Sequence, residues 1–213
     1  GLAEPRSRAA LLVIEDLRIA PLDPSNLESW RRLFSGAHSP CFCRYWHFAG
    51  TKNEWLERCA LDPAANEADA VTAVACSAAE SQGLVALLGD HAVGWMKLTP
   101  RAAVPKLRTL PVYRALPLGD DEGVWSIGCF LVHPEYRRHG VADALLAAAP
   151  EYVRSRDGRL LEAYPRDPHP DDHAPLHDEE ALMGPIALFA SHGFAEVTDL
   201  GATRMYPVYR RAV

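Results

Sequence analysis

The stretch VWSIGCFLVHPEYRRHGVA, residues 124–142, decides the fold. It contains an apolar run at 127–132, which is typical of a strand buried on both faces. Pro134 ends this strand, because proline has no N–H group to donate to a β-ladder. A basic loop with Gly140 follows, and the alanine- and leucine-rich run at 142–149 predicts a helix. The stretch therefore predicts a strand, a turn, a loop and the beginning of a helix.

The basic loop has the features of an anion site. Gly140 and Ala142 are small, so they leave the backbone N–H groups at the start of the helix open to a ligand. The helix dipole attracts negative charge there, and Arg137 and Arg138 add two guanidinium groups. The common nucleotide-binding patterns, Gly-x-x-x-x-Gly-Lys-Ser/Thr and Gly-x-Gly-x-x-Gly, do not occur in the chain. The loop is therefore expected to bind a phosphate or pyrophosphate.

Composition restricts the class of protein further. The chain has 213 residues, 22 basic and 28 acidic, with a net charge of −6, which argues against nucleic acid or an anionic membrane as the main partner. Five cysteines without the spacing of secreted proteins favour a reducing cytoplasm, and no apolar run reaches the length of a membrane span. We expect an N-terminal extension at 1–16 and one domain at 17–213.

The remaining patterns predict alternating strands and helices around one core. The expected class is α/β, with a mixed central sheet of about six to seven strands flanked by helices. Besides the strand and helix of the opening stretch, strands are predicted at 17–22, 84–88, 91–98, 159–164, 195–200 and 203–209, and helices at 27–36, 51–61, 64–81 and 186–191.

Arg137, Gly140 and Ala142 occupy the three defining positions of the loop Gln/Arg-x-x-Gly-x-Gly/Ala. This loop is motif A of the GNAT superfamily of acyl-CoA-dependent N-acyltransferases, which the chain resembles over about residues 17–210. The segment LFASHGF at 188–194 is also similar to the family's Leu-Tyr-x-x-x-Gly-Phe helix ending. Segments 41–46, 124–126 and 161–165 look like an uncharacterised bacterial branch. The resemblance implies the GNAT fold.

The resemblance also implies a co-substrate, acetyl-CoA as acyl donor, and no metal. The strand that precedes the loop would hold the pantetheine arm and the acyl carbonyl, and the loop itself would hold the pyrophosphate. The residues implied in cofactor binding are Phe130, Leu131, Val132, Arg137, Arg138, His139, Gly140, Val141, Ala142 and Phe189.

The usual proton donor of the family is missing. The tyrosine position on the late helix holds Phe189, and the asparagine position seven residues earlier holds Leu182. An amine attacks a thioester only after losing a proton, so the site needs a base and an acid. Tyr164 and Glu162 are our candidates, because residues two apart on a strand share one face. In the alternative interpretation, Glu162 is a packed carboxylate with its hydrogen bonds satisfied, and Tyr164 is an aromatic residue at an interface.

Other side chains could line an acceptor pocket or hold a metal. We expect Tyr45, Trp95 and Trp125 in the substrate pocket. The pair Cys41 and Cys43, although near His38 and His47, lacks the second ligand pair of zinc sites. These cysteines are expected to line the acceptor pocket or the core beside Tyr45 and Trp46. Cys129, inside a strand, is expected to pack as well. The last group is interpreted as part of a solvated acidic loop: His169, His173 and His177.

The predicted function is direct transfer of an acetyl group from acetyl-CoA to the primary amine of a small molecule. Two alternatives stay open at this point. One is acetylation of proteins or peptides, which needs an open groove. The other is a non-catalytic acyl-CoA sensor with the same fold, because fold resemblance does not determine function. The sequence leaves a homodimer open.

Overall fold

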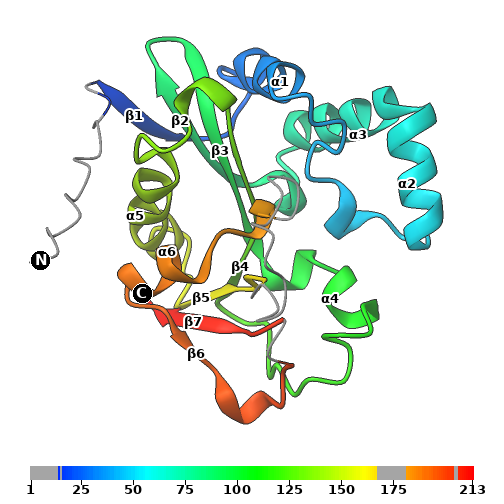
Figure 1. Ribbon diagram of the computed structural model, residues 1–213, viewed down its shortest axis with the longest axis vertical. Helices are drawn as coiled ribbons and strands as arrows, with labels where there is room; N and C mark the ends of the chain where they lie inside the picture. The colour runs from blue at the N-terminus through cyan, green and yellow to red at the C-terminus, as the bar shows by residue number, and fades with distance from the viewer. Residues whose placement is uncertain (1–13, 15, 167–180, 204–205) are drawn as a thin grey trace, which may run out of the picture.

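A seven-stranded mixed sheet forms the centre of the molecule (Figure 1). The computed structural model describes residues 14, 16–166, 181–203 and 206–213. The strand order is β1-β2-β3-β4-β5-β7-β6, and β4 with β5 is the parallel pair. The strands are β1 (Leu17–Pro21), β2 (Gly83–Leu88), β3 (His91–Pro100), β4 (Val124–Val132), β5 (Leu160–Ala163), β6 (Ala195–Glu196) and β7 (Tyr209–Ala212).

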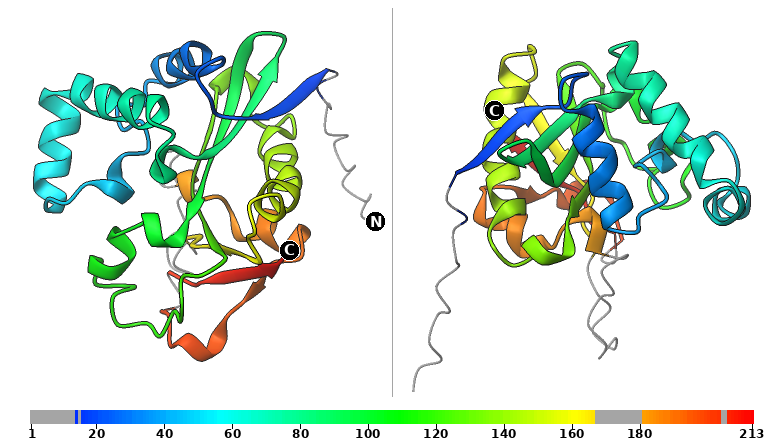
Figure 2. Two further views of the ribbon diagram at one scale, coloured as in Figure 1. Left: turned by 180° about the vertical axis from the view of Figure 1, so that it is seen from behind. Right: turned by 90° about the horizontal axis from the view of Figure 1, so that it is seen from above.

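Helices cover both faces of this sheet, as the view from above in Figure 2 shows. Neighbouring residues of β3 point to opposite faces: Trp95 packs in the core cluster of α1, whereas Met96 packs in that of α5. The fold is thus the predicted mixed α/β architecture. The α-helices are α1 (Leu27–Gly36), α2 (Lys52–Leu61), α3 (Pro63–Ala75), α4 (Lys106–Thr109), α5 (Val141–Arg154) and α6 (Ile186–Ser191). None of the described helices is long and apolar enough to cross a bilayer.

Three predicted elements are shorter than the sequence suggested or lie elsewhere along the chain. The helix expected at 64–81 ends at Ala75, because the chain turns at Ser77 with a φ of 51° and continues as the 3₁₀ helix η2 (Ala79–Ser81). The strand expected at 195–200 gives way to the 3₁₀ helix η6 (Thr198–Leu200). The strand expected at 203–209 begins only at Tyr209, after a proline that cannot donate to a ladder. Helix α6 lies where it was predicted.

The parallel pairing between β4 and β5 ends early. It runs from Val124↔Leu160 to Ile127↔Ala163, and the chain then leaves β5 through Pro165. Strand β4 continues for five more residues, paired with β3 on one side. On the other side of residues 128–132 the described chain places no strand. We call this segment the open half of β4. It begins at a β-bulge, because the register passes from Lys97↔Cys129 to Leu98↔Ile127.

Gly94 allows α5 to lie close to β3. A Cβ atom at this glycine would overlap Cγ1 of Val141, the first residue of α5. We predict that Gly94→Ala lowers the free energy of unfolding by about 1–3 kcal/mol, because the helix must move away from the sheet. Urea denaturation measures the change. The double variant Gly94→Ala/Val141→Ala serves as the control: its loss should be smaller than the sum of the two single losses, and a simple sum would contradict the packing argument.

Candidate active site

The loop between β4 and α5 has the geometry of an anion site. Gly140 is the N-cap of α5 with a φ of 79°, and a Cβ atom built there meets nothing within 4 Å. Arg138 is also left-handed, with a φ of 66°. Alternation of left- and right-handed residues turns successive N–H groups towards one side. The space beside Gly140 at the start of α5 is therefore open, as a phosphate site at this loop requires.

The predicted cofactor residues divide into backbone and side-chain contributors. Phe130, Leu131 and Val141 are buried in the core, so they can offer a ligand only their backbone groups. Phe189 is also fully buried and packs edge-on against Phe130, with ring centroids 6.1 Å apart. The side chains of the loop bind the loop itself: Arg137 Nε donates to the carbonyl of Val132 (3.2 Å), and His139 Nδ1 donates to the carbonyl of Arg137 (2.7 Å). Ala142, Val132 and Arg138 are at least partly accessible.

A cavity of about 490 Å³ adjoins the open half of β4. Gly128 and Cys129 form part of its wall, and Trp46 Nε1 donates a 2.6 Å hydrogen bond to the carbonyl of Gly128. We call it the large cavity. Lys52 and Arg166 are its charged lining residues among those described, and no described carboxylate lines it. Its aromatic lining residues are Tyr45, Trp46, Trp55, Tyr113, Tyr164 and Tyr206.

The structure corrects two of the three predicted pocket residues. Tyr45 does line the large cavity. Trp95 does not, because it packs edge-on against Trp30 of α1, with ring centroids 5.5 Å apart. Trp125 points to the opposite face of the sheet and packs edge-on against Tyr152 of α5 at 5.8 Å. Both tryptophans are core residues. Strand alternation directs Trp125 to the face opposite Cys129, whereas Trp95 shares the face of Cys129 but is buried in the core cluster of α1.

The candidate acid and base are joined in one buried hydrogen-bond network. Tyr164 Oη donates to Glu162 Oε1 (2.5 Å) and lies 2.9 Å from Ser126 Oγ. Glu162 is 0% exposed and forms ion pairs with Arg101 (3.1 Å) and Arg210 (2.7 Å). Burial, together with the charge of Glu162, raises the pKa of Tyr164 well above its usual range. Tyr164 thus keeps its proton and lines the large cavity, whereas Glu162 does not line it.

Sequence reasoning missed several members of this site. Arg101 and Arg210 come from distant parts of the chain, and no local pattern connects either of them to Glu162. Ser126 could have been predicted as a neighbour of Glu162, because the two residues lie opposite each other in the parallel register of β4 and β5. The aromatic residues missed are Trp46, Trp55, Tyr113 and Tyr206.

The cysteines line the large cavity without forming a metal site. Cys41, Cys43 and Cys129 all contribute to its wall, and burial raises the pKa of the Cys43 thiol well above its ordinary value. Among the described residues there is no group of three or more His, Cys, Asp or Glu side chains that could hold a metal ion. His169, His173 and His177 lie outside the described residues.

Solved acetyltransferase structures share this fold. The PaiA N-acetyltransferase of Thermoplasma acidophilum, in complex with coenzyme A, superposes with a TM-score of 0.52 at 9% identity, covering 92% of this chain and 99% of that one. The ribosomal-protein-alanine N-acetyltransferase of Brucella melitensis gives 0.51 at 17%, covering 92% and 100%. An agmatine N-acetyltransferase variant gives 0.53 at 10%, covering 93% and 100%. At these identities the likeness shows the fold alone.

The sequence itself carries the assignment to a family. No curated protein sequence matches the chain. Residues 28–177 match the acetyltransferase (GNAT) family, and this region contains the sheet strands β2 to β5, the anion loop and α5. More than half of the chain is covered. The chain therefore belongs to the GNAT family of acetyltransferases, and the protein is a transferase.

Proposed function

We propose that this protein transfers an acetyl group from acetyl-CoA to the primary amine of a small, largely apolar molecule. The observation that carries the proposal is the position of the large cavity. Its aromatic wall adjoins Gly128 and Cys129, where β4 loses its parallel partner. An amine in the cavity would therefore lie beside a strand edge that has backbone groups to offer.

The proposed binding mode for acetyl-CoA uses the loop and the strand edge together. The open surface at Gly140 and the start of α5 would hold the pyrophosphate, with Arg138 nearby. The backbone of the open half of β4 would hold the pantetheine arm. When bound, acetyl-CoA supplies a thioester carbonyl for the amine to attack. The PaiA structure, which contains coenzyme A, supports this assignment as a fold relative.

The lining of the large cavity favours an uncharged amine. Aromatic side chains bury apolar surface, and no described carboxylate lines the wall to pair with an ammonium ion. Lys52 and Arg166 add positive charge at the same wall. Burial and nearby cations both lower the pKa of a bound ammonium group, so the amine loses its proton more readily before it attacks. This lining supports a small apolar acceptor more than a polyamine.

A panel of acceptors tests the proposal through release of free thiol from acetyl-CoA. We expect 2-phenylethylamine and similar arylalkylamines to be acetylated with a higher kcat/KM than putrescine, spermidine or peptides with a free N-terminus. Preference for peptides would support the protein-directed alternative. Binding of acetyl-CoA without thiol release for any acceptor would support the sensor alternative.

We expect a cytoplasmic enzyme, on the cysteine usage alone.

A charge substitution at Gly140 tests the pyrophosphate site. We predict that Gly140→Asp abolishes detectable binding of CoA in calorimetry, because a carboxylate would face the pyrophosphate at the helix start. Gly140→Asn is the matched control, since it has the same shape and accepts the same left-handed backbone without the charge. The asparagine variant should bind CoA more tightly than the aspartate variant. Equal affinity of the two variants would rule out a charge effect at this loop.

Removal of one hydroxyl tests the acid. We predict that Tyr164→Phe lowers kcat by about 10²–10⁴-fold and leaves the affinity for CoA unchanged, if Tyr164 protonates the departing thiolate. Tyr113→Phe is the control, because Tyr113 lines the same cavity with its ring 5.3 Å from that of Tyr164. The control should keep the parent kcat. Parent-like turnover by Tyr164→Phe would show that another group is the acid.

We infer a positioning role for Glu162 in place of the expected base, because it binds Tyr164 and two arginines and does not line the cavity. We predict that Glu162→Gln lowers the free energy of unfolding by about 3–5 kcal/mol, because it leaves the buried Arg101 guanidinium with less compensating charge. Urea denaturation measures this loss. Arg32→Ala, which removes an exposed pair with Glu28, should cost only about 0–1 kcal/mol. Losses of equal size in both variants would contradict the role of burial.

A further inference from the structure

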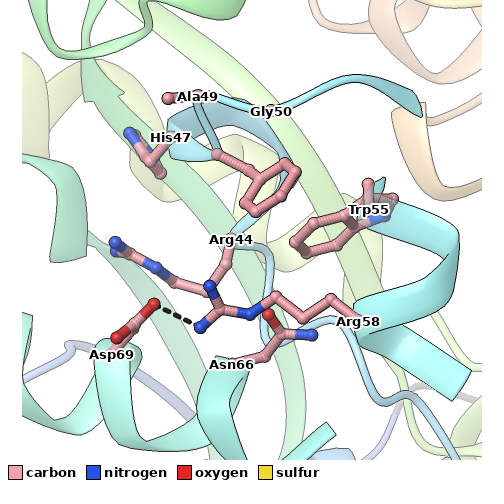
Figure 3. Close-up of a pocket in the computed structure, with 9 residues that line it drawn as sticks. Arg44, His47, Ala49, Gly50, Trp55, Arg58, Asn66 and Asp69 are labelled. Carbon is pink, nitrogen blue, oxygen red and sulfur yellow. Dashed lines mark hydrogen bonds and ion pairs between the residues drawn. The ribbon is translucent and has the colours of Figure 1, made fainter. Parts of the chain in front are cut away.

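A second cavity lies between the 3₁₀ helix η1 (Tyr45–His47), α2 and α3. Its volume is about 290 Å³, and we call it the small cavity. Trp55 lines both it and the large cavity, so the two are neighbours across one indole ring. Figure 3 shows the side chains of Trp55, Arg58 and Asn66 close together in this lining, with the guanidinium of Arg44 pointing away from Trp55. The proposed acetyl transfer does not use any of these polar groups.

Five buried polar atoms in this lining are without a hydrogen-bond partner among the described residues. They are Arg44 Nε, Arg58 Nε, Asn66 Oδ1 and both ring nitrogens of His47. Asn66 is 0% exposed, and its Nδ2 donates to the carbonyl of Pro40 at 3.0 Å. This bond fixes the orientation of the amide, and Oδ1 is then without a donor. A buried polar atom without a partner costs about 1–3 kcal/mol. The presence of five such atoms in one lining favours a polar occupant.

The charges around the small cavity add up to a positive region. The terminal nitrogens of the arginines are engaged: Arg44 pairs with Glu80 (2.8 Å) and Arg58 with Asp69 (2.5 Å). Lys97 lies outside the lining and donates to the backbone carbonyl of Glu80 at 2.6 Å. Burial lowers the pKa of Lys97 to about 8, so it remains mostly charged at neutral pH. In and next to the lining there are therefore three cations and two carboxylates, and one of these carboxylates, Asp69, lines the cavity itself.

His47 adds no positive charge to this lining. Burial in the first place, and then the charges of Lys97 and Arg44, lower the pKa of His47 to about 2, so the imidazole is neutral. An anion would be attracted, and the two arginine Nε–H groups are donors of the kind that carboxylates accept.

We propose that the small cavity binds a small carboxylic acid that also carries a hydroxyl or N–H donor. The carboxylate would accept from Arg44 Nε and Arg58 Nε, and the donor would satisfy Asn66 Oδ1. A bare anion leaves Asn66 Oδ1 unsatisfied, and a neutral molecule leaves the positive charge without a counterion. The rings of Phe48 and Trp55 offer an apolar wall to the carbon skeleton of the ligand. Such a ligand would occupy the opposite side of Trp55 from the acceptor amine.

Hydroxy acids are suitable probes, because they carry both groups and contain no amine for the proposed acetyl transfer. Calorimetry with glycolate, lactate and mandelate, each compared with its carboxamide, tests the site without acetyl-CoA. We expect at least one acid to bind with a stoichiometry of one and its amide to bind at least about tenfold more weakly, because the amide lacks the charge that strengthens the arginine hydrogen bonds.

Arg58→Lys assigns the binding to this cavity. It retains a cation beside Asp69 but removes the Nε–H group, and we expect it to weaken binding of the acid by about tenfold or more. Arg31→Lys is the matched control, because Arg31 Nε donates to Glu67 at 2.6 Å outside the cavity, and affinity should not change. Thermal melts verify that both variants fold. Absence of binding by all three acids, or equal binding by the two variants, would overturn the proposal and leave the small cavity as a water site.

The same titrations separate this inference from the proposed function. Binding of a hydroxy acid that Arg58→Lys weakens supports the small cavity, whether or not any amine is acetylated. Binding that Arg58→Lys leaves unchanged, and that 2-phenylethylamine displaces, would place the acid in the large cavity and overturn the inference.

Discussion

The early end of the parallel pairing between β4 and β5 is the constraint on which the rest of the structure depends. Four residue pairs join the two strands, and the chain leaves β5 at Tyr164 and Pro165. A strand that continues without a partner exposes N–H and C=O groups, which must be satisfied by other groups. Here two of these are met by side chains, since Trp46 Nε1 donates to the carbonyl of Gly128 and Arg137 Nε donates to that of Val132. The backbone groups that remain in the open half of β4 are those we propose for a ligand.

The same divergence places the catalytic candidates. Because β5 ends at Ala163, Tyr164 lies at the wall of the large cavity, while Glu162 stays within the sheet opposite Ser126. The carboxylate is held between two guanidinium groups, and its remaining capacity goes to the tyrosine hydroxyl. Burying an ion network of this kind costs desolvation energy, so its value lies in the orientation it imposes. The network fixes the direction of the Tyr164 hydroxyl.

The two cavities differ in chemistry although they share Trp55. The large one has an aromatic wall with thiols, and it adjoins Gly128 and Cys129 at the start of the open half of β4. The small one is lined by paired arginines whose Nε–H groups are unused. Helices α2 and α3 supply the second site, and a capping box at Thr51 and Glu54 fixes where α2 begins. One helix, α2, thus presents Trp55 to both cavities and Arg58 to the smaller.

Sequence by itself determined the features that depend on short stretches of chain. The apolar run at 127–132, Pro134 and Gly140 specify a strand, a stop and a left-handed cap, and these local signals gave the α/β class and the anion loop. Only the tertiary structure decided where Trp95 and Trp125 pack and which arginines neutralise Glu162. It also decided that Asn66 lines one cavity with Arg44 and Arg58. The reason is physical: propensities and caps act between neighbours in sequence, whereas these contacts join segments brought together by packing of the whole sheet.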